Sequence, residues 1–259
     1  SNIGPAWIVA LGGVGGGVFS RCAERPDGPL VAPSAPVWWR VVDAADQPAP
    51  VAARDVATDR FVSLAGHRVG DLRRALATTD AELEWRPTIG DFLGEGTRGV
   101  RARARASFAA DAAKVAAALD ADAAALQAWS AENARAAIDL FLVADLGGGV
   151  GSALAVHLAA AALQAAEHRG MSRGRFRTIA VLTLREARER AAERSRADDE
   201  RRGCLNGWCA LRDLAATIPG PDGSAEIALP PPFGPARLET PLFDEVYVCG
   251  RPTADEPLD

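Results

Sequence analysis

The chain has 259 residues, of which 48% are hydrophobic and 24% are charged, so it can bury a substantial core and is not a disordered protein. Its formal net charge of −5 argues against a nucleic-acid partner, because binding nucleic acid requires a basic surface. We find no apolar run long enough for a membrane segment, and the first residues resemble a strand rather than a signal peptide. We therefore expect a cytoplasmic protein.

Short apolar runs alternate with segments of helical character along the chain. The pattern predicts strands at residues 7–11, 37–42, 61–64, 138–144, 177–183 and 245–248. Helices are predicted at residues 18–23, after a glycine-rich turn, and then at 69–77, 101–127, 152–167, 184–202 and 205–216. Residues 219–241 hold seven prolines and are predicted to form a loop or extended insertion, and residues 251–259 form a polar tail.

This alternation is typical of an α/β protein with a mostly parallel, doubly wound, Rossmann-like sheet of about six strands and helices on both faces. We expect a single domain over residues 1–259. In the second strand, Trp38 and Trp39 should point to opposite faces of the sheet. We expect both rings to pack in the core rather than to face a partner.

The cysteines and histidines form no pattern that is typical of a metal site or a catalytic triad. The three histidines are scattered, and no C-x-x-C pair occurs. In a cytosolic compartment we expect reduced thiols that are buried or inert. The four cysteines are Cys22, Cys204, Cys209 and Cys249.

The basic residues are arginines with the single exception of Lys114. Arg101, Arg103 and Arg105 alternate along the chain, and helical geometry would spread their charges around the helix. We therefore interpret this segment as the solvated start of a helix rather than as a basic patch.

Two glycine-rich segments, Gly12–Gly17 and Gly147–Gly151, each connect a predicted strand to a predicted helix. In a doubly wound sheet, ligands bind outside the carboxyl ends of the strands, where both segments would lie. Glycine lets a phosphate approach the backbone closely, and the amide groups of the turn and of the following helix then bind the anion. Two such segments in one sheet predict a polyphosphate that is held from both sides.

The first segment does not meet the dinucleotide fingerprint G-x-G-x-x-G, because Val18 stands where a third glycine would follow Gly13 and Gly15. The acid that would bind a ribose is Asp43, at the end of the second predicted strand. No Walker A sequence occurs. A Rossmann-type enzyme that binds a dinucleotide or ATP is an alternative, but it leaves the second glycine segment unexplained.

The second segment, D-L-G-G-G-V-G-S-A at residues 145–153, resembles the G-G-G-T-G-S/T-G signature of the tubulin/FtsZ superfamily. Residues 12–17 resemble that family's first nucleotide loop, Asp43 the acid of its second loop, and residues 94–99 the loop that caps the γ-phosphate. Residues 183–186 take the place of the ribose-side loop, and L-N-G-W-C-A-L at residues 205–211 resembles the helix whose Asn binds guanine. The divergent bacterial tubulin-like group is nearest, over about residues 7–250.

The resemblance implies a module that binds GTP or GDP, with Mg²⁺ near Asp43 and Asp46. Asn206 would hydrogen-bond guanine, and a buried polar contact of this kind discriminates strongly against adenine. The nucleotide-binding residues that the resemblance implies are Gly12, Gly13, Val14, Gly15, Gly16, Asp43, Gly96, Thr97, Arg98, Gly147, Gly148, Gly149, Val150, Gly151, Ser152, Glu186 and Asn206.

Two residues depart from the family signature. Val150 stands where the family has Thr, which removes a hydroxyl that can donate to phosphate, and Ala153 replaces the last glycine. Backbone donors alone can still hold a phosphate, so binding either persists at lower affinity or is lost. If it is lost, the chain is a nucleotide-free scaffold that keeps the fold for interaction with a protein partner.

The superfamily continues into a central helix and a second domain, which supplies the acidic loop that activates the GTP of the neighbouring subunit. This sequence ends about where the sixth strand ends. We expect GTP hydrolysis by this chain alone to be slow or absent, with GTPase activity only as part of a longer protein or assembly. We expect a monomer or a weakly self-associating dimer.

Overall fold

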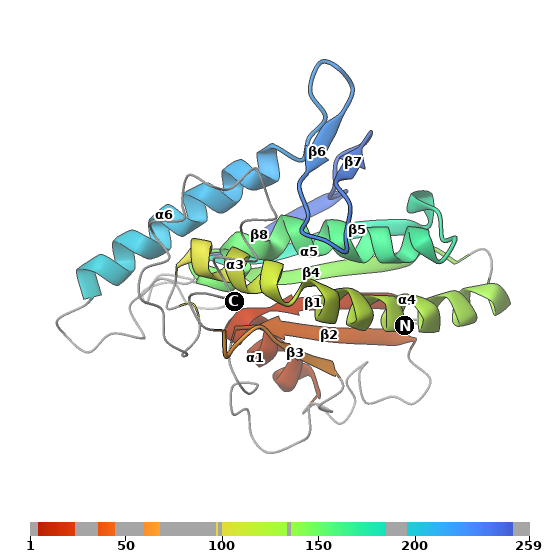
Figure 1. Cartoon of the computed structure of the whole chain (residues 1–259), viewed down its shortest axis with the longest axis horizontal. Helices are drawn as coiled ribbons and strands as arrows, with labels where there is room; N and C mark the ends of the chain where they lie inside the picture. Colours follow the sequence, from red (N-terminus) through yellow and green to blue (C-terminus); the bar gives the residue numbers. More distant parts are fainter. Residues whose placement is uncertain are drawn as a thin grey trace, which may run out of the picture.

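The computed structural model describes residues 5–23, 36–44, 60–67, 97, 100–133, 136–184 and 196–250. A six-stranded sheet in the order β3-β2-β1-β4-β5-β8 runs through them, and all neighbouring strands are parallel. From β1 the chain adds strands on one side and then returns to add strands on the other, which is the doubly wound arrangement. The predicted α/β fold class is confirmed (Figure 1).

All six predicted strands are present, and their bounds differ from the prediction by one or two residues at most. Short apolar runs identify them well because strands of a parallel sheet are buried on both faces. The strands are β1 (Ala6–Leu11), β2 (Val37–Asp43), β3 (Phe61–Ser63), β4 (Ile138–Asp145), β5 (Phe176–Leu184) and β8 (Glu245–Gly250).

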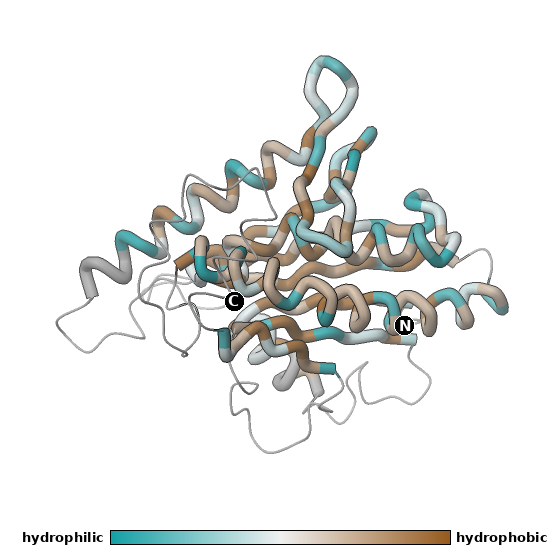
Figure 2. The backbone as a smooth tube through the Cα atoms, in the orientation of Figure 1, coloured by the Kyte–Doolittle hydropathy of each residue, from teal (hydrophilic) through white to brown (hydrophobic). Residues whose placement is uncertain are grey.

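Helices cover both faces of the sheet (Figure 1). One face carries α1, where Gly16 approaches Val41 of β2 above a small cluster of Ala10, Trp39, Val41 and Val143. The opposite face carries the larger core beneath α3, α4 and α5, and Figure 2 shows apolar residues concentrated in the sheet and in α5. The described helices are α1 (Gly12–Ala23), α3 (Arg101–Ala110), α4 (Ala112–Glu132), α5 (Gly149–His168) and α6 (Arg196–Ala215), with a 3-10 turn at Arg173–Arg175.

The tryptophan pair of β2 points to opposite faces of the sheet, as predicted. Trp39 is buried in the α1-side cluster, whereas Trp38 packs edge-on against Trp129 of α4, with ring centroids 6.0 Å apart. On the same face as Trp38, Arg40 Nε donates to Asp122 Oδ2 of α4 over 2.9 Å. Burial raises the pKa of the Asp122 carboxyl, and the paired Arg40 opposes that shift. These contacts fix α4 over the amino-terminal half of the sheet.

Three predicted helix boundaries are wrong. The predicted turn at Gly12–Gly17 belongs to α1, because the change of direction is confined to Gly12, whose φ is +67°. The single helix predicted at residues 101–127 is two helices, since Asp111 leaves helical geometry at φ −103° and ψ 14°. Residues 196–202 of the helix predicted at 184–202 continue without a break into the helix predicted at 205–216, as one helix, α6, whereas residues 185–195 lie outside the described residues.

The proline-rich segment is not wholly loop, because it contains an antiparallel ribbon of β6 (Ala225–Ile227) and β7 (Ala236–Leu238). This ribbon projects from the body of the fold (Figure 1). The thiols were expected to be buried or inert: all four are free, Cys204 and Cys249 are exposed, and Cys22 and Cys209 are partly buried. The predicted helix at residues 69–77 and the tail at 251–259 lie outside the described residues, and the single-domain prediction stays a prediction.

Helix α5 is long and apolar enough to cross a membrane by length and composition. However, 89% of its apolar window is buried inside the fold, between the sheet and the neighbouring helices. Its composition is therefore that of a core helix, which in an α/β protein is enclosed by other elements.

Candidate nucleotide-binding site

The two glycine-rich segments meet at the carboxyl edge of the sheet. A Cβ atom built on Gly12 would lie 3.6 Å from Val150 Cβ, 4.0 Å from the backbone nitrogen of Gly151 and 4.0 Å from Asp43 Oδ1. The end of β1, the end of β2 and the start of α5 therefore converge on one spot. This is the edge at which doubly wound sheets bind their ligands.

Helix α1 begins directly at the end of β1, and Gly12 and Gly15 make this possible. Gly12 supplies the positive φ of the turn, and a Cβ on Gly15 would lie 2.9 Å from the carbonyl carbon of Ala10. Gly13 is exposed and Val14 partly buried, so the first turn of α1 faces the edge of the sheet. Its amide groups have no partner within the helix, as in any first turn.

The second segment is folded back on the end of β4 by Asp145. The buried carboxylate of Asp145 accepts hydrogen bonds from the Gly147 amide and from the Thr183 hydroxyl of β5, both over 3.3 Å. A Cβ on Gly151 would lie 2.4 Å from the carbonyl oxygen of Asp145, so only glycine lets α5 start this close to β4. Asp145 is the first residue of the motif at residues 145–153, but it was not predicted as a site residue.

The N-terminus of α5 is left open by its own side chains. Its N-cap residue is Gly148, at φ −80° and ψ 158°, and no side chain of the described residues caps the helix there. No acidic residue stands in the first turn of α5 or of α1. Both helix ends carry partial positive charge, and they lie side by side at Gly12 and Gly151. Such a pair of helix ends favours an anion between them.

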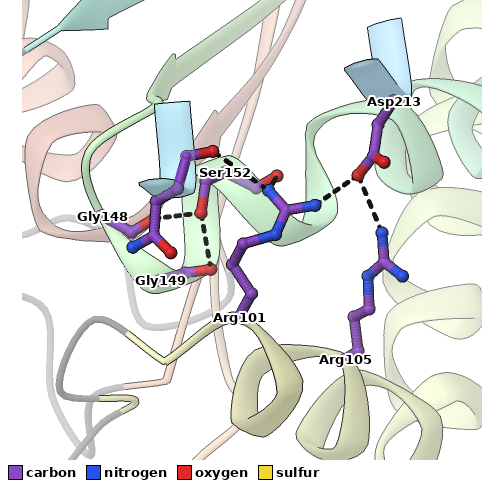
Figure 3. A network of polar contacts seen from close by, with 7 residues as sticks. Arg101, Arg105, Gly148, Gly149, Ser152 and Asp213 are labelled. Carbon is purple, nitrogen blue, oxygen red and sulfur yellow. Dashed lines mark hydrogen bonds and ion pairs between the residues drawn. The ribbon is translucent and has the colours of Figure 1, made fainter. Parts of the chain in front are cut away.

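The two side chains that follow in α5 are turned away from this edge. Val150 is buried and belongs to the main core. Ser152 is also buried, and its hydroxyl donates to the carbonyl oxygens of Gly148 and Gly149 within the same helix turn (Figure 3). The binding groups that α5 offers are thus backbone amides rather than hydroxyls.

Asn206 lies beside the second glycine segment, on α6. Its side-chain Nδ2 donates to the carbonyl oxygen of Gly147 over 3.1 Å, and the residue is buried. Gly203, one turn earlier in α6, would place a Cβ 4.0 Å from the same oxygen. Helix α6 therefore packs against the segment, and the predicted role of Asn206 in binding guanine stays a prediction.

A polar network that the sequence did not predict joins α3, α5 and α6 next to this site. The Arg101 guanidinium donates to the carbonyl oxygen of Ser152 and to the Asp213 carboxylate, and Arg105 reaches the same carboxylate over 2.8 Å (Figure 3). Arg101 also reaches the carbonyl oxygen of Asn206 over 3.5 Å. Burial lowers the pKa of Arg101, and Asp213 opposes that shift. The expectation that Arg101 and Arg105 are solvated is wrong.

His157, on α5, lies next to the same arginines. Burial, together with the positive charges of Arg105 and Arg101, lowers the pKa of its imidazole from 6.5 to about 3. The imidazole is therefore neutral at physiological pH. His157 is half-buried on α5.

Several predicted site residues cannot be placed. Gly96, Arg98, Asp46 and Glu186 lie outside the described residues. Thr97 is described and buried, and its carbonyl oxygen accepts the Val100 amide over 2.9 Å at the entrance to α3. Within the described ranges, no group of three or more His, Cys, Asp or Glu side chains could hold a metal ion. The Mg²⁺ prediction at Asp43 and Asp46 therefore stays a prediction.

Comparison with known proteins gives matches only among solved structures. No protein-family model and no curated protein matches the chain. One similar structure is TubZ of Clostridium botulinum phage c-st, with 11% identity over 80% of this chain and 45% of that chain, at a TM-score of 0.36. A tail-truncated TubZ of the same phage has 12% identity over 81% and 49% of the two chains, at a TM-score of 0.38.

The resemblance of this chain to the tubulin/FtsZ superfamily rests on its sequence motifs. The chain spans about half the length of the two TubZ structures. Each site assignment of this chain rests on its own motifs and contacts.

Proposed function

We propose that this chain is a nucleotide-binding module that holds GTP or GDP at the carboxyl edge of its sheet. The observation that carries the proposal is the adjacency of two helix N-termini, at Gly12 of α1 and Gly151 of α5, without an acidic residue in either first turn. Two positive helix ends side by side favour an anion between them, and each contributes about 0.3–1 kcal/mol to the binding of a negative group. A di- or triphosphate fits this requirement.

In this proposal the backbone holds the phosphates. The amides of Gly12–Gly16 would bind from one side and those of Gly147–Gly151 from the other, as the sequence motifs suggest. The Val150 side chain takes no part, because it is buried in the core. Asp43, at the end of β2, would lie on the side of the phosphates where Mg²⁺ binds. Its carboxylate would hold the ion directly or through water.

Guanine selectivity is assigned to Asn206. The bond from its Nδ2 to Gly147 orients the carboxamide at the edge of the site, so little rotamer freedom would be lost on binding. Backbone amides and helix ends bind an anion without moving a proton, so the proposal is for binding, with slow or absent hydrolysis by this chain alone. A bacterial, cytoplasmic setting is part of the same proposal.

Isothermal titration of the purified chain with GTP, GDP, ATP and NAD, with and without Mg²⁺, tests the proposal. We expect one site that prefers guanine nucleotides and binds GTP more tightly with Mg²⁺. Equal binding of ATP would contradict the role of Asn206 but leave the phosphate site intact. Failure of all four ligands to bind would contradict the proposal and favour a nucleotide-free scaffold.

A second candidate function is a Rossmann-type dinucleotide enzyme. The position of Asp43 favours it, because an acid at the end of β2 beside the β1–α1 turn is where such proteins bind a ribose. The sheet order is the same in that class. It does not account for the second glycine segment, and preferential NAD binding in the titration would decide for it.

A further inference from the structure

Arg101 is the first residue of α3, and its side chain contacts two other helices. Its guanidinium donates to the carbonyl oxygen of Ser152, in the first turn of α5, and to the carboxylate of Asp213 on α6 (Figure 3). It also lies 3.5 Å from the carbonyl oxygen of Asn206. One side chain therefore joins the helix that begins at the second glycine segment to the helix that carries Asn206.

Asn206 and Asp213 hold one face of α6 against the rest of the fold. They are about two helical turns apart, so both lie on the same side of the helix, and Ala210 between them is buried. Asn206 Nδ2 donates to the carbonyl oxygen of Gly147 over 3.1 Å, whereas Asp213 pairs with Arg101. The position of Asn206 is thus set by its own side chain at one end and by Arg101 at the other.

The contacts of Arg101 lie in a largely buried place. Its side chain is 14% exposed, and burial lowers the pKa of the guanidinium while the Asp213 carboxylate opposes that shift. Arginine stays charged in proteins, and a buried charge is costly without its acceptors. Because these acceptors come from both α5 and α6, a displacement of either helix would leave the charge partly unpaired. The contacts therefore resist movement of α6 relative to α5.

We propose that Arg101 is a positioning residue for base recognition, which holds Asn206 at a fixed distance from the first turn of α5. This inference rests on the proposed guanine-nucleotide site. The base and the phosphates are at opposite ends of a nucleotide, so both can be bound well only if Asn206 and the backbone of the glycine segment have the right separation. A displacement of about 1 Å is enough to lose such a contact.

The charge of Arg101 offers a different explanation, because a cation near the phosphates would strengthen the binding of every nucleotide alike. Arg101→Lys separates the two explanations. Lysine keeps the charge, but its ammonium group cannot span the acceptors that the planar guanidinium reaches on α5 and α6. Positioning predicts a loss of base selectivity in this variant, and charge alone predicts none.

Titrations of GTP and ATP into the wild type, Arg101→Lys and Arg105→Lys test the proposal. We expect Arg101→Lys to lower the ratio of GTP to ATP affinity by about fivefold or more, through weaker GTP binding. Arg105→Lys is the matched control, because Arg105 contacts the same Asp213 carboxylate over 2.8 Å, and its ratio should stay within about twofold of the wild type. An unchanged ratio in Arg101→Lys, or an equal loss in Arg105→Lys, would overturn the proposal.

A double variant shows whether Arg101 acts through Asn206. In an Asn206→Ala background, Arg101→Lys should lower the ratio no further, because the group that Arg101 positions is gone. A further fall would contradict the positioning role. A wild-type chain that binds neither nucleotide, or both equally, would contradict the proposed guanine site and this inference with it. A selective wild type whose ratio Arg101→Lys leaves unchanged would contradict this inference alone.

Hydrogen exchange in the free protein supplies a readout that needs no nucleotide. Arg101→Lys should speed the exchange of the α6 amides around Asn206, whereas Arg105→Lys should leave their protection close to that of the wild type. Asp213→Asn removes the acceptor on α6 from the other side of the contact, and it should lower the GTP to ATP ratio in the same direction. Equal protection in Arg101→Lys and the wild type would overturn the proposal.

Discussion

Asn206 of α6 donates its side-chain amide to the carbonyl oxygen of Gly147, 59 residues earlier in the chain. This bond joins the helix that resembles a guanine-binding element to the segment that resembles a phosphate-binding loop. It places the two motifs in one site, although nothing in the local sequence of either predicts the other. The bond also gives a direct way to test what Asn206 does.

Asn206→Ala should lower the selectivity for GTP over ATP, and not only the affinity. If Asn206 contacts guanine, its loss leaves base donors unpaired and weakens GTP binding by about tenfold or more, while ATP binding changes little. Parallel titrations of both nucleotides measure this ratio. Leu205→Ala, at an exposed neighbour on α6, is the control. An equal loss for GTP and ATP would show that Asn206 only supports the Gly147 segment.

Gly151→Ala should destabilise the fold strongly, because the new Cβ would lie 2.4 Å from the Asp145 carbonyl oxygen. Overpacking of this kind costs about 1–3 kcal/mol, and here the obstacle is backbone. Gly17→Ala in α1 is the matched control, since a Cβ there meets nothing within 4 Å, and a helical alanine should add up to about 1 kcal/mol. Urea denaturation measures both, and equal effects would contradict the described packing of α5 on β4.

Asp213→Asn should reduce the free energy of unfolding by about 2–4 kcal/mol. It leaves the guanidinium groups of Arg101 and Arg105 without the carboxylate that both contact, in a largely buried place. Asp222→Asn, at an exposed turn, should stay within about 0.5 kcal/mol of the wild type. A double-mutant cycle with Arg101→Gln measures the coupling, and a coupling energy near zero would argue against the network.

Acid should destabilise the fold partly through His157. Its pKa is about 3 in the folded state and 6.5 when unfolded, so the unfolded chain binds more protons between these values. The contribution of neutral His157 to the free energy of unfolding is fully present above pH 6.5 and is lost as the pH falls toward 3. At pH 5 the loss relative to pH 7 should be about 1–2 kcal/mol. His157→Asn should remove this part of the pH dependence, and an unchanged slope in the variant would contradict the assignment.

Sequence patterns predicted the sheet well because its strands are short apolar runs between glycines, prolines and helical segments. They did not predict that α1 begins directly at Gly12. This start depends on the close approach of Gly15 to Ala10 in the folded chain, which the sequence alone does not show. They also missed the break at Asp111, where no proline or glycine stands. A break of this kind is set by packing, not by the local residues.

The sequence predicted part of the residue set that the structure brings together at the carboxyl edge of the sheet. The glycine segments and Asn206 were identified by motif and order, and the structure brings Gly12, Asp43, Gly151 and Asn206 to the same edge. The contact of Arg101 with Asp213 spans 112 residues, and such a pairing leaves no trace in a single sequence. The sequence motif also implies that Ser152 binds nucleotide; its hydroxyl donates to a carbonyl of its own helix, and its role stays a prediction.

The most direct test of the central claim is a titration of GTP into the wild type, Gly13→Glu and Gly13→Gln. Gly13 is exposed in the first turn of α1, so both side chains fit, and glutamate at a helix N-terminus stabilises the free protein by about 0.3–1 kcal/mol. If phosphates bind between the two helix ends, Gly13→Glu should raise thermal stability yet weaken GTP binding at least tenfold, whereas Gly13→Gln should bind nearly as the wild type does. Unchanged GTP affinity in Gly13→Glu would contradict a phosphate site at these helix ends.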